Sequence, residues 1–417
     1  MKNRTLFNYI RQKSTKETGR LIALTGARQT GKTTLVRKGF PDYTYLSLED
    51  PVTRPDFVAL SAPQWYQHYP RSILDEVQKA PSIIESIKAV YDRYSDARSI
   101  LLGSSQILLM DQIRESLAGR VSLVELYPLT LPEMLTDSWE DPVMESRLIR
   151  FLATGERETL HHGVPLQEDG YAKASRYLAH YLEFGAMPSI MDPGLSNEDR
   201  YDWLGNYVRT YLQRDLRDLA NLRDLVPFVR LLRAIAGLTG GLLNVNELAR
   251  LAGVTARTAN RFVSYLELSY QVNLLQPWFR NRSKRLSKSP KIHLLDPGIQ
   301  RVLLNRRGRP TGPEFESAVV AEIHKQVKTS RLPVDCYHLR TVDGREVDLL
   351  IETEGGFLPV EIKMTERISS ADARHLRRLD TILDKPILGS LVLSNDPHIR
   401  DLGEGITALP VGWALGT

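Results

Sequence analysis

The chain has 417 residues, of which 42% are hydrophobic and 25% charged, and these ordinary globular values exclude a largely disordered protein. The formal net charge is +5, and the single cysteine, Cys336, excludes a disulfide framework and a cysteine-rich zinc site. Because no apolar run is long enough to span a membrane and the charged N-terminus lacks the apolar core of a signal peptide, we expect a cytoplasmic protein without a membrane partner and with roughly two to four domains.

Short apolar runs alternate with helical stretches in the first 135 residues. Nearly continuous apolar runs are typical of strands that are buried on both faces of a parallel sheet, with crossover helices between them. The predicted strands are Leu21–Thr25, Tyr43–Leu48, Ser72–Leu74, Ser99–Leu102 and Val121–Leu126.

A glycine-rich motif follows the first of these strands and opens a predicted helix. Its residues, Gly26-Ala27-Arg28-Gln29-Thr30-Gly31-Lys32-Thr33, match the phosphate-binding pattern G-x-x-x-x-G-K-[ST]. The glycines let backbone N–H groups curl around phosphate oxygens, Lys32 supplies a point charge, and Thr33 offers a hydroxyl to Mg²⁺. We therefore predict ATP and Mg²⁺ as cofactors, bound by residues 26–34, which include Thr34.

Polar residues at the ends of the later strands complete this prediction. Asp75 is expected to hold Mg²⁺ through water, and Glu76 to orient or deprotonate the attacking water, the alternative being two solvated acids. Ser104 or Ser105 would sense the γ-phosphate, unless they form an ordinary turn. Arg120 is a candidate to reach the phosphates of a neighbouring subunit, and a surface arginine is the alternative.

Long amphipathic stretches replace the strands from about residue 135 to 235 and predict a helical domain. The segment Trp203–Leu222 places one apolar stripe on a helical face. That stripe consists of Trp203, Tyr207, Tyr211, Leu212, Leu216 and Leu219.

Residues 242–275 predict a helix-turn-helix. Asn246 is expected to cap a helix that runs to Leu251, Gly253 to form the turn, and Thr255 to cap a second helix that runs to about Leu268. Two strands of a wing are expected at Val272–Gln276 and Lys291–Leu295.

Basic residues concentrate in the segment 271–310, which has ten of them and one acid, Asp296, for a local charge of +9. Such a segment beside a helix-turn-helix indicates DNA, with affinity drawn mainly from phosphates; a solvated face or a surface for an acidic partner are the alternatives. Trp278 and Phe279 interrupt the run and are assigned to the core. The residues expected to contact DNA are Arg257, Asn260, Arg261, Arg280, Arg282, Lys284, Arg285 and Lys288, with Tyr265 beside the first three.

The C-terminal part is predicted to be α/β again, with a helix at Phe315–Val327 and strands at Val347–Ile351, Leu358–Ile362 and Gly389–Leu393. Four of its residues form a second chemical pattern, and they are Glu316, Asp348, Glu361 and Lys363.

Glu361 and Lys363 share one face of a strand because side chains alternate. Asp348, Glu361 and the carbonyl of Ile362 are expected to hold Mg²⁺, with Lys363 positioning a water that attacks a phosphodiester. Glu322 competes with Glu316 for the helix position. The alternatives are a nuclease-like fold that only binds, or a surface ion pair between Glu361 and Lys363.

These motifs together resemble the AAA+-like ATPases whose C-terminal region carries domain of unknown function 4143, over about residues 3 to 393. The matching pieces are GARQTGKTTL, ILDEVQKAP, ILLGSSQILLM, ESLAGRVSLVELYPLTLPEM, FGAMPSI, YVRTYLQRDLRDL and NRSKRLSKSPKIHLLDPG. The resemblance implies that Lys32, Thr33, Asp75 and Glu76 serve the nucleotide, that Ser104 is the first sensor, and that Arg120 is the arginine finger.

One departure lies at Gly185-Ala186-Met187-Pro188, where the group usually has Gly-Gly. The C-terminal pattern looks like that of the PD-(D/E)xK nuclease fold, and the group often carries it.

The expected fold is α/β: a P-loop AAA+-like parallel-sheet domain at 1–135, a helical lid at 136–238, a winged helix-turn-helix at 239–310 and a restriction-endonuclease-like domain at 311–417. The expected function is ATP hydrolysis by a homo-oligomer that engages DNA and cuts it through the last domain. The alternative is a nucleotide-gated switch or scaffold that binds a protein or nucleic acid without cleavage.

Overall fold

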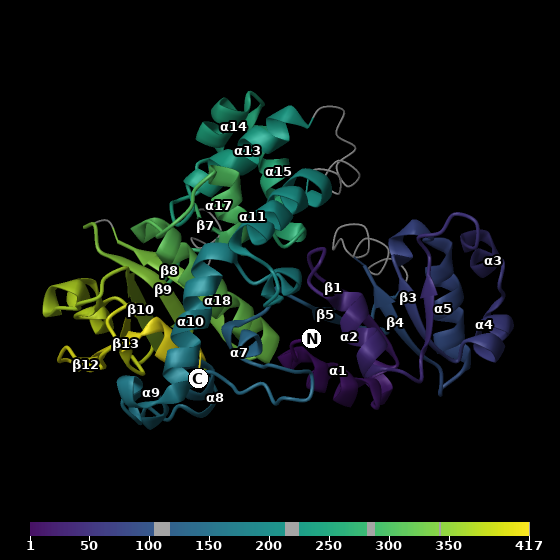
Figure 1. The fold of residues 1–417 in the computed structure, drawn as a ribbon, viewed down its shortest axis with the longest axis horizontal. Helices are drawn as coiled ribbons and strands as arrows, with labels where there is room; N and C mark the ends of the chain where they lie inside the picture. Colours follow the sequence, from purple (N-terminus) through teal and green to yellow (C-terminus); the bar gives the residue numbers. More distant parts are fainter. Residues whose placement is uncertain (104–116, 213–224, 282–287, 342, 417) are drawn as a thin grey trace.

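The computed structural model describes residues 1–103, 117–212, 225–281, 288–341 and 343–416 (Figure 1). Three groups of elements are visible: a parallel sheet with its helices, coloured purple to blue; a helical group around α13–α15; and a second sheet, coloured green to yellow. This confirms the predicted mixed α/β class with a P-loop-type sheet and a C-terminal sheet domain.

The N-terminal sheet has the strand order β2-β3-β4-β1-β5, and all neighbours in it run parallel. Ile22 and Leu24 face one hydrophobic cluster while Leu21 and Ala23 face another, so the sheet is buried on both sides as its continuous apolar strands predicted. Its elements are α1 (Thr5–Ser14), η1 (Glu17–Gly19), β1 (Leu21–Thr25), α2 (Lys32–Gly39), β2 (Thr44–Ser47), α3 (Arg54–Val58), α4 (Ala62–His68), β3 (Arg71–Asp75), η2 (Val77–Lys79), α5 (Ser82–Arg93), β4 (Arg98–Leu102) and β5 (Val121–Glu125).

The helices of residues 136–238 contribute to two hydrophobic cores, and α10 takes part in both, with Tyr181 in one and Phe184 in the other. Tyr181 of α10 packs in the same cluster as Phe315 and the C-terminal sheet, whereas Phe228 of α13 packs against Phe262 of the winged helix. The expected helix at Trp203–Leu222 changes to a π-helix at Tyr207, and residues 213–224 lie outside the described part. The elements are α7 (Leu131–Met134), α8 (Arg147–Thr154), α9 (Glu158–His161), η3 (Pro165–Gln167), α10 (Asp169–Phe184), η4 (Pro188–Met191), α11 (Asn197–Asn206), η5 (Tyr207–Leu212) and α13 (Val226–Gly237).

The helix-turn-helix consists of α14 (Val245–Ala252) and α15 (Ala256–Leu268), followed by an antiparallel wing of β6 (Val272–Leu275) and β7 (Lys291–Leu294). Gly253 turns the chain at φ 71°, and Thr255 caps α15 as predicted. The cap of α14 is Asn244 and not Asn246, because the Asn244 side chain accepts the Glu247 N–H at 3.1 Å.

The C-terminal sheet has the order β12-β13-β11-β10-β9-β8, with β9 antiparallel and β11 parallel to the central β10. The three predicted strands correspond to β9, β10 and β11, whereas the flanking strands were not predicted. The elements are α17 (Pro297–Leu304), α18 (Gly312–Ser330), β8 (Asp335–Arg340), β9 (Glu346–Glu352), β10 (Phe357–Lys363), η6 (Ser370–Leu376), η7 (Leu379–Thr381), β11 (Ser390–Ser394), β12 (Arg400–Asp401), β13 (Ile406–Pro410) and α19 (Val411–Gly416).

A small buried cluster joins all three groups of elements. It contains Ala27 of the glycine-rich loop, Tyr127 after β5, Tyr270 after α15, Leu295 after β7 and Ala321 of α18. The loop, the winged helix and the C-terminal sheet domain therefore share one packed junction. None of the helices in the described ranges combines the length and apolar character that crossing a bilayer requires.

Candidate nucleotide site and C-terminal acid cluster

The glycine-rich loop connects β1 to the N-terminus of α2 and requires its glycines. Gly26 has φ 145°, and a Cβ there would lie 2.1 Å from the Leu126 carbonyl oxygen; Gly31 has φ 89°. The buried Lys32 Nζ donates to the carbonyls of Gly26 and Ala27 at 2.9 and 2.8 Å. The ammonium group thus lies inside its own loop, where phosphate oxygens would take over from the two carbonyls.

The expected magnesium ligands lie in contact at the carboxyl end of the sheet. Thr33 Oγ1 donates to Asp75 Oδ2 at 2.8 Å, and Tyr45 OH donates to the same oxygen at 2.7 Å. Burial, and then the hydrogen bond to Asp75, raise the pKa of Tyr45, so this phenol remains a donor. A hydroxyl and a carboxylate side by side fit Mg²⁺, which binds proteins through a few oxygen ligands and keeps several waters.

Glu76 follows with φ 55°, a left-handed conformation that turns the chain directly after β3. Its N–H donates to Asp75 Oδ1 at 3.0 Å, and Gln78 Nε2 donates to Glu76 Oε2. Asp75 thus contacts Thr33 and Tyr45, whereas the Glu76 carboxylate contacts Gln78. Ser104 and Ser105, the expected sensors, lie outside the described residues.

Arg120 lies at the opposite end of the sheet from the loop. It precedes β5, whose Val121 is in register with Leu21, the first residue of β1. Its guanidinium pairs with both carboxylate oxygens of Asp92, at 2.7 and 3.1 Å. Arg120 therefore does not approach the loop of its own chain, so an arginine-finger role would require a second subunit.

Arg4, which no motif indicated, forms hydrogen bonds that connect the loop to neighbouring segments. Its buried guanidinium donates to the Thr30 carbonyl at 2.9 Å and to the Tyr127 carbonyl at 2.5 Å, and it pairs with Glu133 at 3.1 Å. A buried arginine with three partners stabilises the backbone around it. Arg4 thus ties the loop to β5 and to α7.

Tyr270 brings the winged helix to the base of the loop. Its hydroxyl lies 2.7 Å from Thr25 Oγ1, at the end of β1, and donates to Glu125 Oε1 at 3.1 Å. Tyr127 OH donates to the other oxygen of Glu125 at 3.1 Å, and the two tyrosine rings meet edge to face. Burial raises the pKa of both tyrosines, so both remain protonated donors.

The Gly-Ala-Met-Pro stretch is fixed by a buried carboxylate. Asp296 accepts the N–H groups of Ala186 at 2.8 Å and of Ile299 at 3.1 Å, and a Cβ at Gly185 would lie 1.9 Å from Asp296 Oδ1. Glycine is therefore required at 185, while the buried Ala186 fits the structure without a second glycine. Burial raises the pKa of Asp296.

Five of the eight residues expected to contact DNA lie in the described part of the chain, and all five are exposed. Arg257, Asn260 and Arg261 are exposed on one face of α15, and Tyr265 packs against the core instead. Arg280 and Lys288 are exposed beside the wing. Arg282, Lys284 and Arg285 lie outside the described residues, and Trp278 is buried against Phe357 as predicted.

The other basic residues of the segment 271–310 do not form one open basic surface. Lys291 and Arg301 are buried. Arg306 pairs with Glu314 at 2.5 Å, Arg307 with Glu198 at 2.6 Å and Arg309 with Glu366 at 3.4 Å. Much of the local charge of +9 is thus neutralised within the chain.

The C-terminal acids gather around two lysines. Lys291 Nζ, from β7, lies 2.9 Å from Glu316, 2.7 Å from Glu346 and 3.7 Å from Asp348. Lys363 Nζ lies 2.6 Å from Glu361 and 4.0 Å from Asp348. We call these six residues the acid cluster.

Glu316 is the helix residue that joins this cluster. Glu322 lies elsewhere: its side chain accepts the Leu131 N–H at 2.6 Å and pairs with Lys325 at 2.8 Å. The structure therefore brings Glu316, Asp348, Glu361 and Lys363 of the sequence pattern together, along with Lys291 and Glu346, which the pattern did not include.

A divalent cation does not fit the acid cluster as its side chains lie. Asp348 directs Oδ1 toward Lys291, and its Oδ2 accepts the Ile362 N–H at 2.8 Å. In the part of the chain that the structure describes, no three His, Cys, Asp or Glu side chains converge on a metal position. Burial, and then the charge of Asp348, raise the pKa of both Glu316 and Glu361 to about 7.

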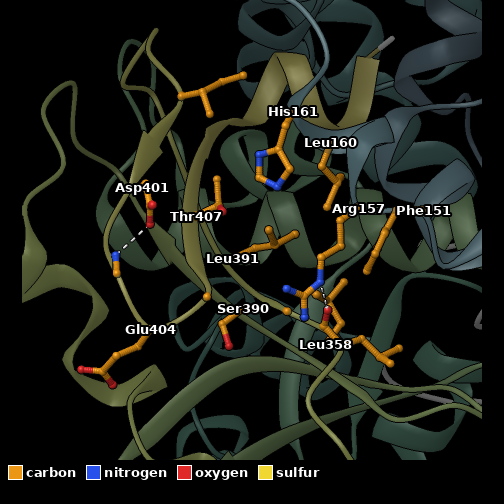
Figure 2. A pocket seen from close by; sticks show the side chains of 15 residues that line it. Phe151, Arg157, Leu160, His161, Leu358, Ser390, Leu391, Asp401, Glu404 and Thr407 are labelled. Atoms are coloured by element: carbon orange, nitrogen blue, oxygen red, sulfur yellow. Dashed lines mark hydrogen bonds between the residues drawn. The ribbon is translucent and has the colours of Figure 1, made fainter.

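A separate pocket of about 330 Å³ opens between α9 and the C-terminal sheet (Figure 2). Arg157 and His161 line one side and Asp401 and Glu404 the other, and Arg157 Nε donates to the Leu388 carbonyl at 2.6 Å. Its lining includes no residue of the glycine-rich loop or of the acid cluster.

Family comparisons cover most of the chain. An AAA domain matches residues 18–135, domain of unknown function DUF8612 matches 175–309, and domain of unknown function DUF4143 matches 311–414. Uncharacterized proteins of Mycobacterium tuberculosis and Mycobacterium bovis are each 30% identical over 409 residues, covering 95% of this chain and 81% of the relative. A Walker-type ATPase of Pyrococcus abyssi is similar over 71% of this chain and 95% of that chain, with 16% identity and a TM-score of 0.46. The chain belongs to the family of AAA+-like P-loop ATPases that carry a C-terminal DUF4143 region.

Proposed function

We propose that the protein binds and hydrolyses ATP at the glycine-rich loop and uses the nucleotide to control a DNA-binding winged helix. ATP binding and hydrolysis are supported by the direct contact of Thr33 with Asp75, beside the loop that contains Lys32. The Lys32 ammonium, the Thr33 hydroxyl and the Asp75 carboxylate thereby lie at one end of a parallel sheet, where P-loop proteins bind nucleotides.

The roles of the chain's own residues follow from this geometry. The loop N–H groups and Lys32 would bind the phosphates, while Thr33 and Asp75 would hold Mg²⁺, which neutralises phosphate charge when bound. Glu76 would orient the attacking water, and Ser104 would sense the γ-phosphate. Arg120 would act on a neighbouring copy, so the proposal includes a homo-oligomer.

DNA binding is supported by the exposed face of α15 and the basic residues near it. Arg257, Asn260 and Arg261 lie where a recognition helix presents its groove-facing side chains, and Arg280 and Lys288 would bind phosphates nearby. Tyr270, directly after α15, touches the base of the loop. A nucleotide-dependent shift of the loop would therefore reach α15 through a hydrogen bond and a packed junction.

For the C-terminal domain, the contacts of Lys291 favour the binding alternative over cleavage. Cleavage would require a cation on the carboxylates of the acid cluster, and the Lys291 ammonium already lies 2.9 Å from Glu316 and 3.7 Å from Asp348. We therefore include a C-terminal domain that binds without cutting in the proposed function.

The decisive experiment measures ATP hydrolysis by the full chain with duplex, single-stranded and branched DNA at two salt concentrations. We expect stimulation that weakens steeply with salt, because phosphate contacts release counterions. ATP hydrolysis that no DNA changes would refute the DNA half and favour a nucleotide-gated scaffold for a protein partner. The Lys32→Ala variant is the control, and turnover retained in it would refute the ATP-site assignment.

A further inference from the structure

The acid cluster contains an ammonium group where a nuclease-like fold would place its cation. Lys291 is only 3% exposed, and its Nζ lies within 4 Å of three carboxylates that come from α18 and β9. A buried charge of this kind persists only when it is paired, so the contacts with Glu316 and Glu346 are what keep Lys291 charged inside the fold.

Lys291 comes from the winged helix and not from the nuclease-like sheet. Its strand β7 pairs with β6, where Leu275 is opposite Lys291, and the chain at Leu242 forms a bridge to Lys291 from the other side. The Gly240 N–H donates to the Ile292 carbonyl at 2.8 Å. With its backbone held on both sides, Lys291 is fixed in the cluster.

The same carboxylates cannot serve Lys291 and a divalent cation together. Mg²⁺ binds carboxylate oxygens at about 2.0–2.1 Å and demands a nearly octahedral arrangement. Glu316 Oε1 and Asp348 Oδ1 face the ammonium at 2.9 and 3.7 Å, and Asp348 is one of the ligands expected for such an ion. A cation drawn to these oxygens would meet the positive charge of Lys291.

We propose that Lys291 is a built-in counter-ion that takes the place of a divalent cation in the acid cluster, so that the winged helix keeps the C-terminal domain metal-free and unable to cleave. Four carboxylates share the cluster with two ammonium groups, and removing Lys291 leaves Lys363 as the ammonium group of the cluster. The resulting excess of negative charge would then attract a divalent cation.

The test measures Mn²⁺ binding to the full chain without nucleotide, by electron paramagnetic resonance of the free ion. Wild-type protein is expected to have no Mn²⁺ site that depends on Asp348. Lys291→Gln is expected to gain about one site per chain, and Lys291→Gln combined with Asp348→Asn to lose it again. Lys291→Arg keeps the charge and is expected to stay without the site. Far-UV circular dichroism and a cooperative thermal unfolding transition report that each variant is folded.

Two outcomes would overturn the proposal. One is an Asp348-dependent Mn²⁺ site in the wild-type protein, and the other is a folded Lys291→Gln variant without a new site. If Lys291→Gln does not fold, Lys291→Gln with Glu346→Gln removes one carboxylate together with its partner and is read in the same way, because Glu316, Asp348 and Glu361 remain. These readings do not depend on ATP hydrolysis, so a failure of the proposed ATPase function is seen separately.

Discussion

Replacement of Tyr270 by Phe tests whether the winged helix is mechanically linked to the nucleotide loop. The change keeps the buried ring and deletes the hydroxyl that contacts Thr25 and donates to Glu125. A hydrogen bond to a charged group contributes about 1.5–3 kcal/mol. Glu125 still accepts the Tyr127 hydroxyl at 3.1 Å, so its carboxylate keeps one hydrogen bond. We therefore expect the variant to lose interaction free energy near the lower limit of that range.

The lost free energy is expected to weaken the contact between the winged helix and the end of β1 before the loop. A difference of about 1.4 kcal/mol changes an equilibrium constant tenfold. Hydrogen exchange of the α15 amides that open when the winged helix separates from the loop should therefore become roughly tenfold faster in Tyr270→Phe. The assay is hydrogen–deuterium exchange by mass spectrometry, with and without an ATP analogue. We also expect the analogue to slow α15 exchange in the wild type and to have little effect on it in the variant.

Tyr127→Phe is the matched control, because it also removes one hydrogen bond to Glu125 but leaves the contact of Tyr270 in place. It should leave α15 exchange close to that of the wild type. Equal acceleration by the two variants would show that Glu125 matters only for local stability. A wild-type response of α15 in Tyr270→Phe would refute the proposed link itself.

Three further predictions concern the sites separately. Lys32→Ala should reduce ATP hydrolysis by roughly a hundredfold or more, because a P-loop lysine stabilises transferred charge, and a steady-state phosphate-release assay measures this. Lys288→Ala should weaken DNA binding and lower its salt slope by about 1, because a phosphate contact is lost, whereas Arg307→Ala, whose arginine pairs with Glu198, should leave both unchanged in a fluorescence anisotropy titration. Glu361, with its pKa raised to about 7, binds a proton more tightly when folded, so its contribution to stability is largest below about pH 4.5 and is lost as pH rises toward 7, by up to about 3 kcal/mol. Glu361→Gln should flatten that part of the denaturation profile, and an unchanged slope would exclude Glu361 as its source.

The loop and its sheet were predictable from sequence because local and tertiary preferences agree there. Strands buried on both faces are continuously apolar, and parallel strands bring Asp75 to the same edge as the loop regardless of the details of packing. The turn at Gly253 and the cap at Thr255 were predictable for a similar reason, since each depends on neighbours along the chain. The choice between Asn244 and Asn246 depends on which residues of α14 face the core, and periodicity alone did not decide it.

The distribution of the helices and the pairing of charges were not predictable, because both depend on contacts distant in sequence. An amphipathic helix signals that one face is buried but not against which partner. Tyr181 of α10 packs with the C-terminal sheet domain, while Phe184 of the same helix joins the core of α13 and the winged helix. The strand β8 alternates poorly and forms a sheet edge, which weakens its signal. A local charge count could not reveal that Lys291 is enclosed by Glu316 and Glu346.

The winged helix is the element through which the two candidate sites would communicate. Tyr270 precedes β6 and contacts Thr25, the last residue of β1 before the loop, while Lys291 begins β7 and lies in the acid cluster. These strands pair with each other through four residues, from Val272 opposite Leu294 to Leu275 opposite Lys291. A displacement of Tyr270 by the nucleotide would therefore be carried along β6 to the residue opposite Lys291. Ion pairs with the acid cluster hold Lys291, so a displacement of β7 would have to work against them. The nucleotide state and the C-terminal domain would therefore be coupled in both directions.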